Sequence, residues 1–473
     1  MKTMKSLALK NRNLIICCAI MAAVYLLDSL IFFSQFYLMY DFFSEKTISA
    51  VATGWSYLAQ GAGMLLFMLL YKTRTKMSAR REFQVVLFLL EVPVVIMTVL
   101  VPDKILLIIL IFILNVIIGL HTGFTFTLAA AHVNGSRLGL CYGLAYAFGA
   151  FGTWLISMVS GGDLTSYRII FADSLIIALI VALILMYRDA VENTPEEKPV
   201  EADEITGALA LSPENPDGRK ILILLCVIIA VMTPISGIGT NNNLYIEYCQ
   251  NLDLLAQRSF YAVGLIMAGL IFDKNRMIGG VCAVVSLIYP SALIMIYHES
   301  GMLTLVIGLS YMILGFFAVY RAAAFMTVAA ESRKLYLAPL GLAVSRACEA
   351  VIVLVITETG CDELTSVILV SVLFIPLVIV FSLMVRAQYA DREAVAAAHR
   401  ELSAEERRVA FAGRYGLTRR EEEISVFLSE GLSNGEIAET LQLSENTVRF
   451  HVSNILKKTG MKDRNEVSRA YRQ

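Results

Sequence analysis

Apolar runs about as long as a bilayer is thick are the feature that most limits what this chain can fold into. Hydrophobic residues make up 57% of its 473 residues, and charged residues make up 17%. Each long run predicts a transmembrane helix, so we expect an all-α chain with a twelve-span bundle. The expected spans lie near residues 14–39, 47–71, 83–101, 105–130, 138–159, 169–187, 220–245, 259–272, 277–297, 303–330, 335–357 and 364–385.

The basic residues between these runs are distributed unevenly. With alternating crossings, eighteen Lys and Arg residues fall on one side of the membrane, and only Lys46, Lys104, Arg168 and Arg258 fall on the other. Because positively charged loops stay in the cytoplasm, we expect both termini there. The first run has no small-residue cleavage site, which predicts a retained span and not a signal peptide.

Polar segments divide the chain into five expected parts. Residues 188–219 are rich in Glu and Pro, which favours a cytoplasmic linker between two six-span halves, 1–187 and 220–385. Residues 386–416 contain no Pro and many Ala, Glu and Arg residues, which predicts a largely helical linker. Residues 417–473 are expected to form a separate domain.

That last domain marks its own helix boundaries. Gly431 and Gly460 stand where helices commonly end in a residue with positive φ. Only three residues separate a helix ending near Leu441 from the next, which is the spacing of a helix-turn-helix. The expected helix starts carry capping signals: capping-box spacing at Thr418 and Glu421, Ser433 and Glu436, Asp463 and Glu466, and a single cap at Ser444.

The third of these helices has two different faces. Val448, Val452, Ile455 and Leu456 make an apolar face, and Arg449, Phe450, Ser453 and Lys457 recur on another. Residues 444–473 hold seven basic and three acidic residues, whereas 417–443 hold two basic and six acidic. An ordinary amphipathic bundle or a protein-interaction module is the alternative, but the basic charge around the third helix favours nucleic acid as the partner.

The order of these residues closely resembles the LuxR-type helix-turn-helix family. The motifs are L-T-x-R-E-x-E at 417–423, S-N-x-E-I-A at 433–438 and T-V-R-x-H-x-x-N-I at 447–455. The resemblance implies a four-helix domain that binds double-stranded DNA as a homodimer on paired half-sites, with its third helix in the major groove. Carried over to this sequence, base edges would be contacted by Arg449, Phe450 and Ser453, and phosphates by Thr447, Lys457 and Lys458.

Two positions depart from that family pattern. Gly435 stands where the family usually has Lys, which removes an expected phosphate contact and weakens the second helix. Thr459 stands where the family usually has Leu, which loosens the last turn of the third helix. Neither change breaks the apolar pattern of the domain.

The membrane part resembles the major facilitator superfamily in its six-plus-six layout. Residues 269–276, G-L-I-F-D-K-N-R, are similar to the gating-loop motif of that superfamily without its second Gly. The equivalent first-half loop, 71–81, has basic residues but no Asp, and a transporter that lacks half of this motif could have lost turnover. The resemblance implies a ligand cavity lined by spans one, four, seven and ten.

Ionisable residues at membrane depth are costly and usually face a cavity or one another. Asp28, His121 and Arg321 are the candidate cavity residues, with an interior polar role as the alternative for His121. Arg346 and Glu349 are three residues apart and are expected to neutralise one another. Glu91 is a further buried candidate. Asn241, Asn242 and Asn243 are expected at an exposed loop entrance.

Other chemistry is sparse in the sequence. The eight Cys residues show no C-x-x-C spacing, although Cys249 and Cys361 lie near the outer face and could pair. No P-loop, catalytic triad or zinc signature is visible. We therefore expect no enzyme activity, no cofactor and no metal site.

These features lead to one main hypothesis and two alternatives. The main hypothesis is a regulator in a bacterial inner membrane, in which an unknown small-molecule ligand binds the bilayer-embedded part and controls DNA binding. A secondary transporter with an appended autoregulatory DNA-binding domain is the first alternative. A protein-binding adaptor is the second, and it would show no salt-dependent affinity for DNA.

Overall fold

The computed structural model describes residues 2–40, 42–78, 80–101, 103–159, 166–187, 216–240, 254–287, 303–360 and 363–472. By its internal contacts the chain divides into two compact units, unit 1 (residues 1–387) and unit 2 (residues 388–473). Within the described residues every regular element is a helix. The all-α prediction is therefore confirmed for that part of the chain.

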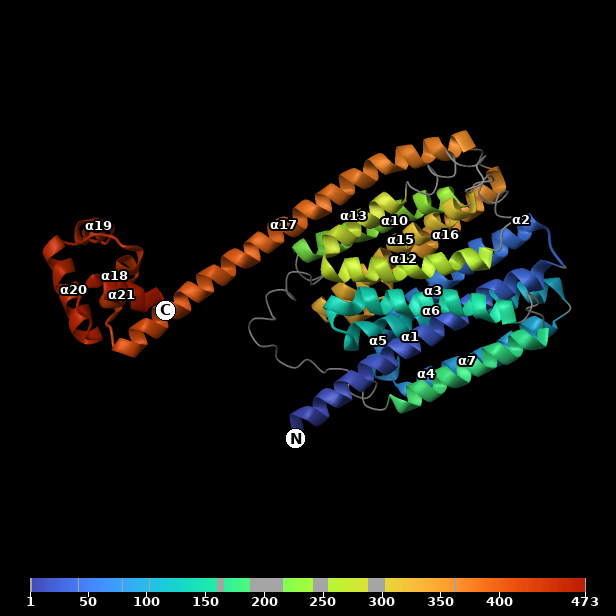
Figure 1. The fold of residues 1–473 in the computed structure, drawn as a ribbon, viewed down its shortest axis with the longest axis horizontal. Coiled ribbons are helices and arrows are strands. Elements are labelled where there is room, and N and C mark those ends of the chain that lie inside the picture. The colour runs from blue at the N-terminus through green and yellow to red at the C-terminus, as the bar shows by residue number, and fades with distance from the viewer. Residues whose placement is uncertain are drawn as a thin grey trace. The chain divides into compact units, whose positions relative to one another are not determined.

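The first half of unit 1 consists of long helices joined by short connections (Figure 1). Asp103 and Asn134 begin two of its helical segments, because their side chains accept the backbone N–H groups of Leu106 and Ser136. The elements are α1 (Lys2–Tyr40), α2 (Glu45–Ile48), the π-helix η1 (Ser49–Trp55), α3 (Ser56–Ser78), α4 (Arg81–Leu100), α5 (Lys104–His132), the 3-10 helix η2 (Gly135–Arg137), α6 (Leu138–Val159) and α7 (Ser166–Met186).

The second half of unit 1 repeats this plan of long apolar helices. Its elements are α10 (Pro216–Thr240), α12 (Leu254–Lys274), α13 (Arg276–Ser286), α15 (Leu303–Ser332), the 3-10 helix η3 (Leu335–Leu337), α16 (Leu340–Thr359) and α17 (Glu363–Tyr415). The helix α17 has 53 residues, so it begins in unit 1 and ends in unit 2. It includes most of residues 386–416, the segment that the sequence predicts to be largely helical.

Nine helices among the described residues are long and apolar enough to span a bilayer. Together with the number of helices, this makes the chain a multi-pass membrane protein. The expected runs at 47–71, 259–272 and 277–297 are not among the nine; α13, within the last, has 11 residues. The count of twelve therefore stays a prediction.

The helices of unit 1 approach closely where glycines face a neighbouring backbone. A Cβ at Gly63 of α3 would overlap the backbone of Val116 in α5, and a Cβ at Gly119 would overlap that of Gln60. Small residues at such crossings allow tight packing of membrane helices. One apolar core runs through residues of both halves, from Ile16 in α1 to Met384 in α17. The two halves therefore form one body.

Unit 2 is built on its own apolar core. It contains the end of α17, followed by α18 (Arg419–Glu430), α19 (Asn434–Thr440), α20 (Glu445–Thr459) and α21 (Arg464–Arg472). The fully buried residues of the core include Ile424, Ile437, Val448 and Val467. Phe411 of α17 also belongs to this core, ahead of the expected domain start at 417. The last turns of α17 are therefore part of the folded domain.

Candidate functional site

The helix α20 carries the candidate DNA-contacting residues, and its own sequence sets where it begins and ends. The Ser444 hydroxyl accepts the backbone N–H of Thr447 at 3.1 Å, as the predicted cap requires. Gly460 ends the helix with a φ of 71°. Val448 and Ile455 are fully buried, and so the opposite face of α20 points outward.

The outward face of α20 is polar and basic, with one large aromatic side chain. Arg449, Phe450, Ser453 and Lys457 are all exposed, and Phe450 is 63% exposed. The Arg449 guanidinium pairs with Glu445 one turn earlier, at 2.8 Å. This exposed ion pair holds the Arg449 side chain along the helix, and a stronger acceptor can replace Glu445 in it.

Lys458 is also exposed, but its ammonium group bonds to two other residues of unit 2. Its Nζ lies 2.6 Å from Glu421 Oε2 and 3.1 Å from the Gly416 carbonyl oxygen. The same Glu421 oxygen accepts the Thr418 backbone N–H at 2.8 Å. Burial raises the pKa of Glu421, but the hydrogen bonds from Lys458 and Thr418 together lower it by more than burial raises it. The net pKa of Glu421 therefore lies below its usual value.

Unit 1 contains a cavity of about 380 Å³ between its two halves. Helices α1, α3, α5 and α6 line it from the first half, and α10, α12, α15 and α16 line it from the second. Its charged lining residues are Asp28, Arg321, Arg346 and Glu349. Six tyrosines complete much of the wall: Tyr25, Tyr57, Tyr142, Tyr146, Tyr261 and Tyr311.

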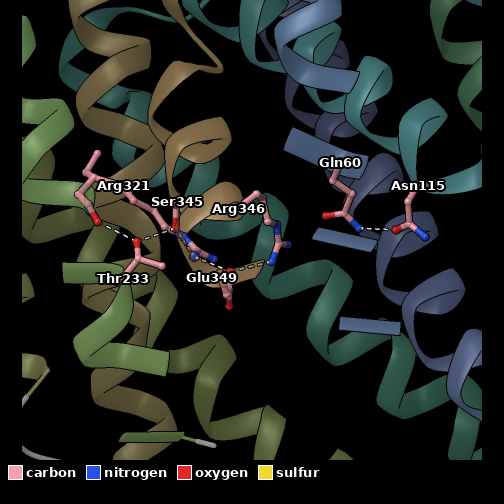
Figure 2. A network of polar contacts seen from close by, with 8 residues as sticks. Gln60, Asn115, Thr233, Arg321, Ser345, Arg346 and Glu349 are labelled. Atoms are coloured by element: carbon pink, nitrogen blue, oxygen red, sulfur yellow. Dashed lines mark hydrogen bonds and ion pairs between the residues drawn. The ribbon is translucent and has the colours of Figure 1, made fainter. Parts of the chain in front are cut away.

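Three of the charged residues form a group that we call the charged trio: Arg321, Arg346 and Glu349 (Figure 2). Glu349 Oε2 lies 3.1 Å from Arg346 Nη1 and 3.5 Å from Arg321 Nη1. Arg321 also donates to the Ser345 hydroxyl at 2.9 Å, and Thr233 donates to the same hydroxyl at 3.1 Å. The trio is therefore anchored to α10 and α16, and it places two cations beside one carboxylate.

A second polar group lies at the other end of the labelled set in Figure 2. Gln60 donates to Asn115 Oδ1 at 2.8 Å, and Asn115 donates to the Ser56 hydroxyl at 3.1 Å and the Gln35 side-chain oxygen at 3.2 Å. Gln60 also lines the cavity. These bonds tie α1, α3 and α5 together beside the cavity.

Comparison with known proteins separates the two units. Residues 416–470 match the family model described as "Bacterial regulatory proteins, luxR family". The C-terminal domain is a LuxR-family DNA-binding domain. Over 54 residues it is 46% identical to the uncharacterized transcriptional regulatory protein YhcZ of Bacillus subtilis, and over 50 residues it is 50% identical to the transcriptional regulatory protein DegU of Brevibacillus brevis.

These matches cover 11% of this chain, and 25% and 21% of the two relatives. The chain therefore spans about a quarter of the length of these curated relatives, and only the LuxR-family domain is shared.

Unit 1 is similar in fold to transporters of the major facilitator superfamily. The human organic anion transporter MFSD10 matches with a TM-score of 0.53 and 13% identity, over 79% of this chain and 99% of that one. The nucleoside transporter NupG matches with a TM-score of 0.52 and 14% identity, over 80% and 99%. At such low identity the likeness is one of fold, and it agrees with the predicted resemblance of the membrane part to that superfamily.

The structure brings two of the three predicted cavity residues together and places the third elsewhere. Asp28 and Arg321 line the cavity, whereas His121 does not. The His121 ring is fully buried, 3.1 Å from Glu91 Oε2 and stacked on Phe88 at 3.7 Å between centroids. The histidine ring is therefore packed between α4 and α5.

Arg346 and Glu349 pair with one another as the sequence predicts, yet both also line the cavity. The sequence did not indicate that Arg346 and Glu349 line the cavity, because two opposite charges three residues apart on a helix need no further partner. The sequence prediction also did not include the six cavity tyrosines, which we call the tyrosine wall. The spacing of Tyr25 and Asp28 in α1, and of Tyr142 and Tyr146 in α6, places each pair one helical turn apart and is a signal that could have found it.

The capping pattern of the LuxR-family domain needs one correction. Both capping boxes at Thr418 and Ser433 are present, and Gly431 ends α18 with a φ of 89°. Asp463 accepts the Glu466 backbone N–H at 3.0 Å, but the Glu466 carboxylate accepts from Lys462 N and does not complete the third box.

The gating-loop fragment is ordered around Asp273. The two carboxylate oxygens of Asp273 accept the backbone N–H groups of Gly139 and Leu140, at 2.8 Å and 2.7 Å. This bond fastens the end of α12 to the start of α6, across the two halves. Asn241 to Asn243, Cys249, Cys361 and most of the linker 188–219 lie outside the described residues.

Proposed function

We propose that this chain is a membrane-embedded one-component transcriptional regulator. The cavity of unit 1 takes a small molecule, and the LuxR-family domain binds paired half-sites on DNA as a homodimer. Both termini lie in the cytoplasm of a bacterium, where the domain reaches the chromosome.

The observation that carries this proposal is the helix α17. Four of its residues, Val370, Leu377, Phe381 and Met384, belong to the apolar core of unit 1, and Phe411 belongs to the core of the LuxR-family domain. The helix runs without a break from Glu363 to Tyr415. A continuous helix can carry a change in one end to the other, whereas a flexible tether cannot.

Ligand control of this kind requires different affinities for two conformations of unit 1. A ligand that binds one conformation about a hundredfold better shifts the balance by about 2.7 kcal/mol. That free-energy shift changes the ratio of bound to free DNA sites by up to about a hundredfold. Ligand binding alone can therefore control DNA binding.

The base-contacting residues under this proposal are Arg449, Phe450 and Ser453, supported by their exposure on α20. Among the candidate phosphate contacts, Lys457 is exposed, whereas Thr447 bonds to Ser444 and Lys458 bonds to Glu421. Two of the three Lys458 ammonium donors are engaged by Glu421 and Gly416, whereas Lys457 is exposed, which favours Lys457 as the larger contribution.

The test begins with the purified full-length protein and a pool of random DNA sites. Selected sites are placed before a reporter gene in a bacterial host, and the host is screened with a library of small metabolites. A compound that changes reporter output is then labelled and offered to proteoliposomes with and without an ion gradient.

Saturable binding without accumulation supports the regulator. Gradient-driven accumulation supports the alternative, a secondary transporter with an autoregulatory domain. Absence of any salt-dependent DNA affinity would contradict both and leave the adaptor hypothesis. The partial gating motif, with Asp273 in one loop only, favours the first outcome.

A further inference from the structure

The charges that line the cavity do not balance locally. In the charged trio, Arg321 and Arg346 share a single carboxylate oxygen of Glu349. The Nε atoms of both arginines are buried without a hydrogen-bond partner among the described residues. Two guanidinium groups beside one carboxylate leave an excess positive charge, which a bound anionic group would neutralise.

Arg321 is fixed in place, which makes this a built site and not a mobile surface charge. Its side chain is 8% exposed, and its Nη1 bonds to the Ser345 hydroxyl. Arg346 lies with its guanidinium carbon 4.1 Å from the centre of the Tyr57 ring. A planar carboxylate is the ligand group that fits guanidinium donors held in such fixed positions.

Asp28, in the first half of unit 1, offers a carboxylate that a positively charged group would complement. It lies on α1 and lines the same cavity, and its Oδ1 is buried without a hydrogen-bond partner among the described residues. Its carboxylate forms no ion pair with any described residue. A carboxylate at membrane depth is costly unless a cation or donor faces it. An ammonium group on a ligand would meet that need.

The space around these charges is aromatic. Tyr25 stacks on Tyr146 at 4.8 Å between ring centres and meets Tyr142 edge-on at 5.5 Å. Tyr146 in turn meets Tyr261 edge-on at 5.4 Å. Ring walls of this kind can stack on a flat apolar body or meet it edge-on. The volume of about 380 Å³ suits a molecule of amino-acid size.

We propose that the cavity binds a small aromatic zwitterion of the amino-acid type, with its carboxylate at the charged trio and its ammonium group at Asp28. This inference rests on the proposed function, because it names the ligand class of the same cavity. The aromatic body lies against the tyrosines that line the same cavity.

The test compares probes that differ by one charge each. The probes are L-tyrosine, tyramine, 3-(4-hydroxyphenyl)propionate and 4-ethylphenol, with matching sets built on phenylalanine and tryptophan. Binding to the full-length protein in detergent is measured by calorimetry. In at least one set, the amino acid should bind ten times or more tighter than its amine, its acid and its uncharged analogue. Equal binding of an analogue that lacks one charge overturns the proposal, and so does absence of binding by all three amino acids.

Variants locate the two charges. Asp28→Asn should reduce the affinity of the bound amino acid to that of its acid analogue and leave the affinity of the acid analogue unreduced. Glu358→Gln is the matched control, because Glu358 is an acid in an exposed ion pair with Lys46, away from the cavity lining. This control should bind as the unaltered protein does. Equal losses for all probes in Asp28→Asn would indicate damage to the fold and contradict the assignment of the ammonium position.

DNA binding distinguishes this inference from the function on which it rests. If the amino acid binds but the affinity for a selected DNA site is unchanged, regulation fails while the ligand class stands. If a compound that lacks one of the two charges alters DNA binding through the cavity, the ligand class fails while regulation stands.

Discussion

Arg449 and Lys457 stand on the same exposed face of α20 but are suited to different parts of DNA. We expect Arg449→Ala to lower the affinity for the best DNA site by about 1 to 3 kcal/mol and to relax the base preference, because a bidentate base contact is lost. Lys457→Ala should weaken all sequences alike and flatten the salt dependence by about one unit of slope. Selection from a random-site pool and titration over a range of salt concentrations measure the two effects. Unchanged selection by Arg449→Ala would refute the base contact.

Glu421 provides a pH-dependent contribution to the stability of the LuxR-family domain. Its net pKa is lowered by Lys458 and Thr418, so its contribution is present above about pH 4.5 and is lost as the pH falls through the lowered pKa. Glu421→Gln should cost about 1 to 3 kcal/mol at pH 7, because a buried carboxylate that accepts a charged donor is removed.

Thermal unfolding of residues 388–473 between pH 7 and pH 3 measures this effect, and the difference between variant and parent should shrink toward acid. The exposed Glu430→Gln is the control, with a change within about 0.5 kcal/mol. A difference that is constant with pH would show that the Glu421 charge is not the cause.

At the scale of elements, α17 is the part whose stiffness can be tested. Replacing residues 388–406 by a Gly/Ser segment of equal length keeps the LuxR-family domain tethered but removes the helix. We expect the response to ligand to disappear while DNA binding persists. A replacement of equal length by alternating Glu-, Ala- and Lys-rich helical sequence is the control and should retain the response. A full response through the Gly/Ser segment would exclude signalling along the helix.

The elements of the LuxR-family domain could be predicted from sequence because their boundaries depend on nearby residues. Thr418, Ser433 and Ser444 bond to backbone groups three positions later, and Gly431 and Gly460 adopt the expected positive φ. Glu466 was wrongly assigned to a capping box, because Lys462 N offers its carboxylate a competing donor. The positive φ of Gln442 in the turn also carried no sequence signal.

For the whole molecule, the main prediction is that changes in the cavity act on DNA through the rest of the chain. Asp28→Asn and Arg321→Gln should each abolish ligand-dependent transcription, because each removes one of the charges that line the cavity. A reporter measured with and without ligand tests this. Membrane insertion, and DNA binding by residues 388–473 alone, should be unaffected. Normal responses in both variants would show that the two residues are structural.

The cavity was harder to predict than the helices, for reasons of geometry. Apolar runs reveal which segments cross a membrane, but they do not show which side of each helix faces its neighbours. Asp28 and Arg321 could be predicted to line the cavity because ionised groups at membrane depth are costly unless they face a cavity or one another. For His121 the same argument left an interior polar role open, and its ring lies beside Glu91 and Phe88. The tyrosine wall combines residues from five helices that only the fold brings together.

The helix α17 also limits how this protein finds its DNA. A regulator that is free in solution searches the chromosome by diffusing to it, but a reader on a helix that starts within a membrane bundle moves only in the plane of the bilayer. Along α17, only 26 residues lie between Met384, in the core of unit 1, and Phe411, in the core of unit 2. If the LuxR-family domain binds DNA while unit 1 stays in the bilayer, the chromosomal locus must travel to the membrane, and the position and mobility of the target gene set how quickly the two meet.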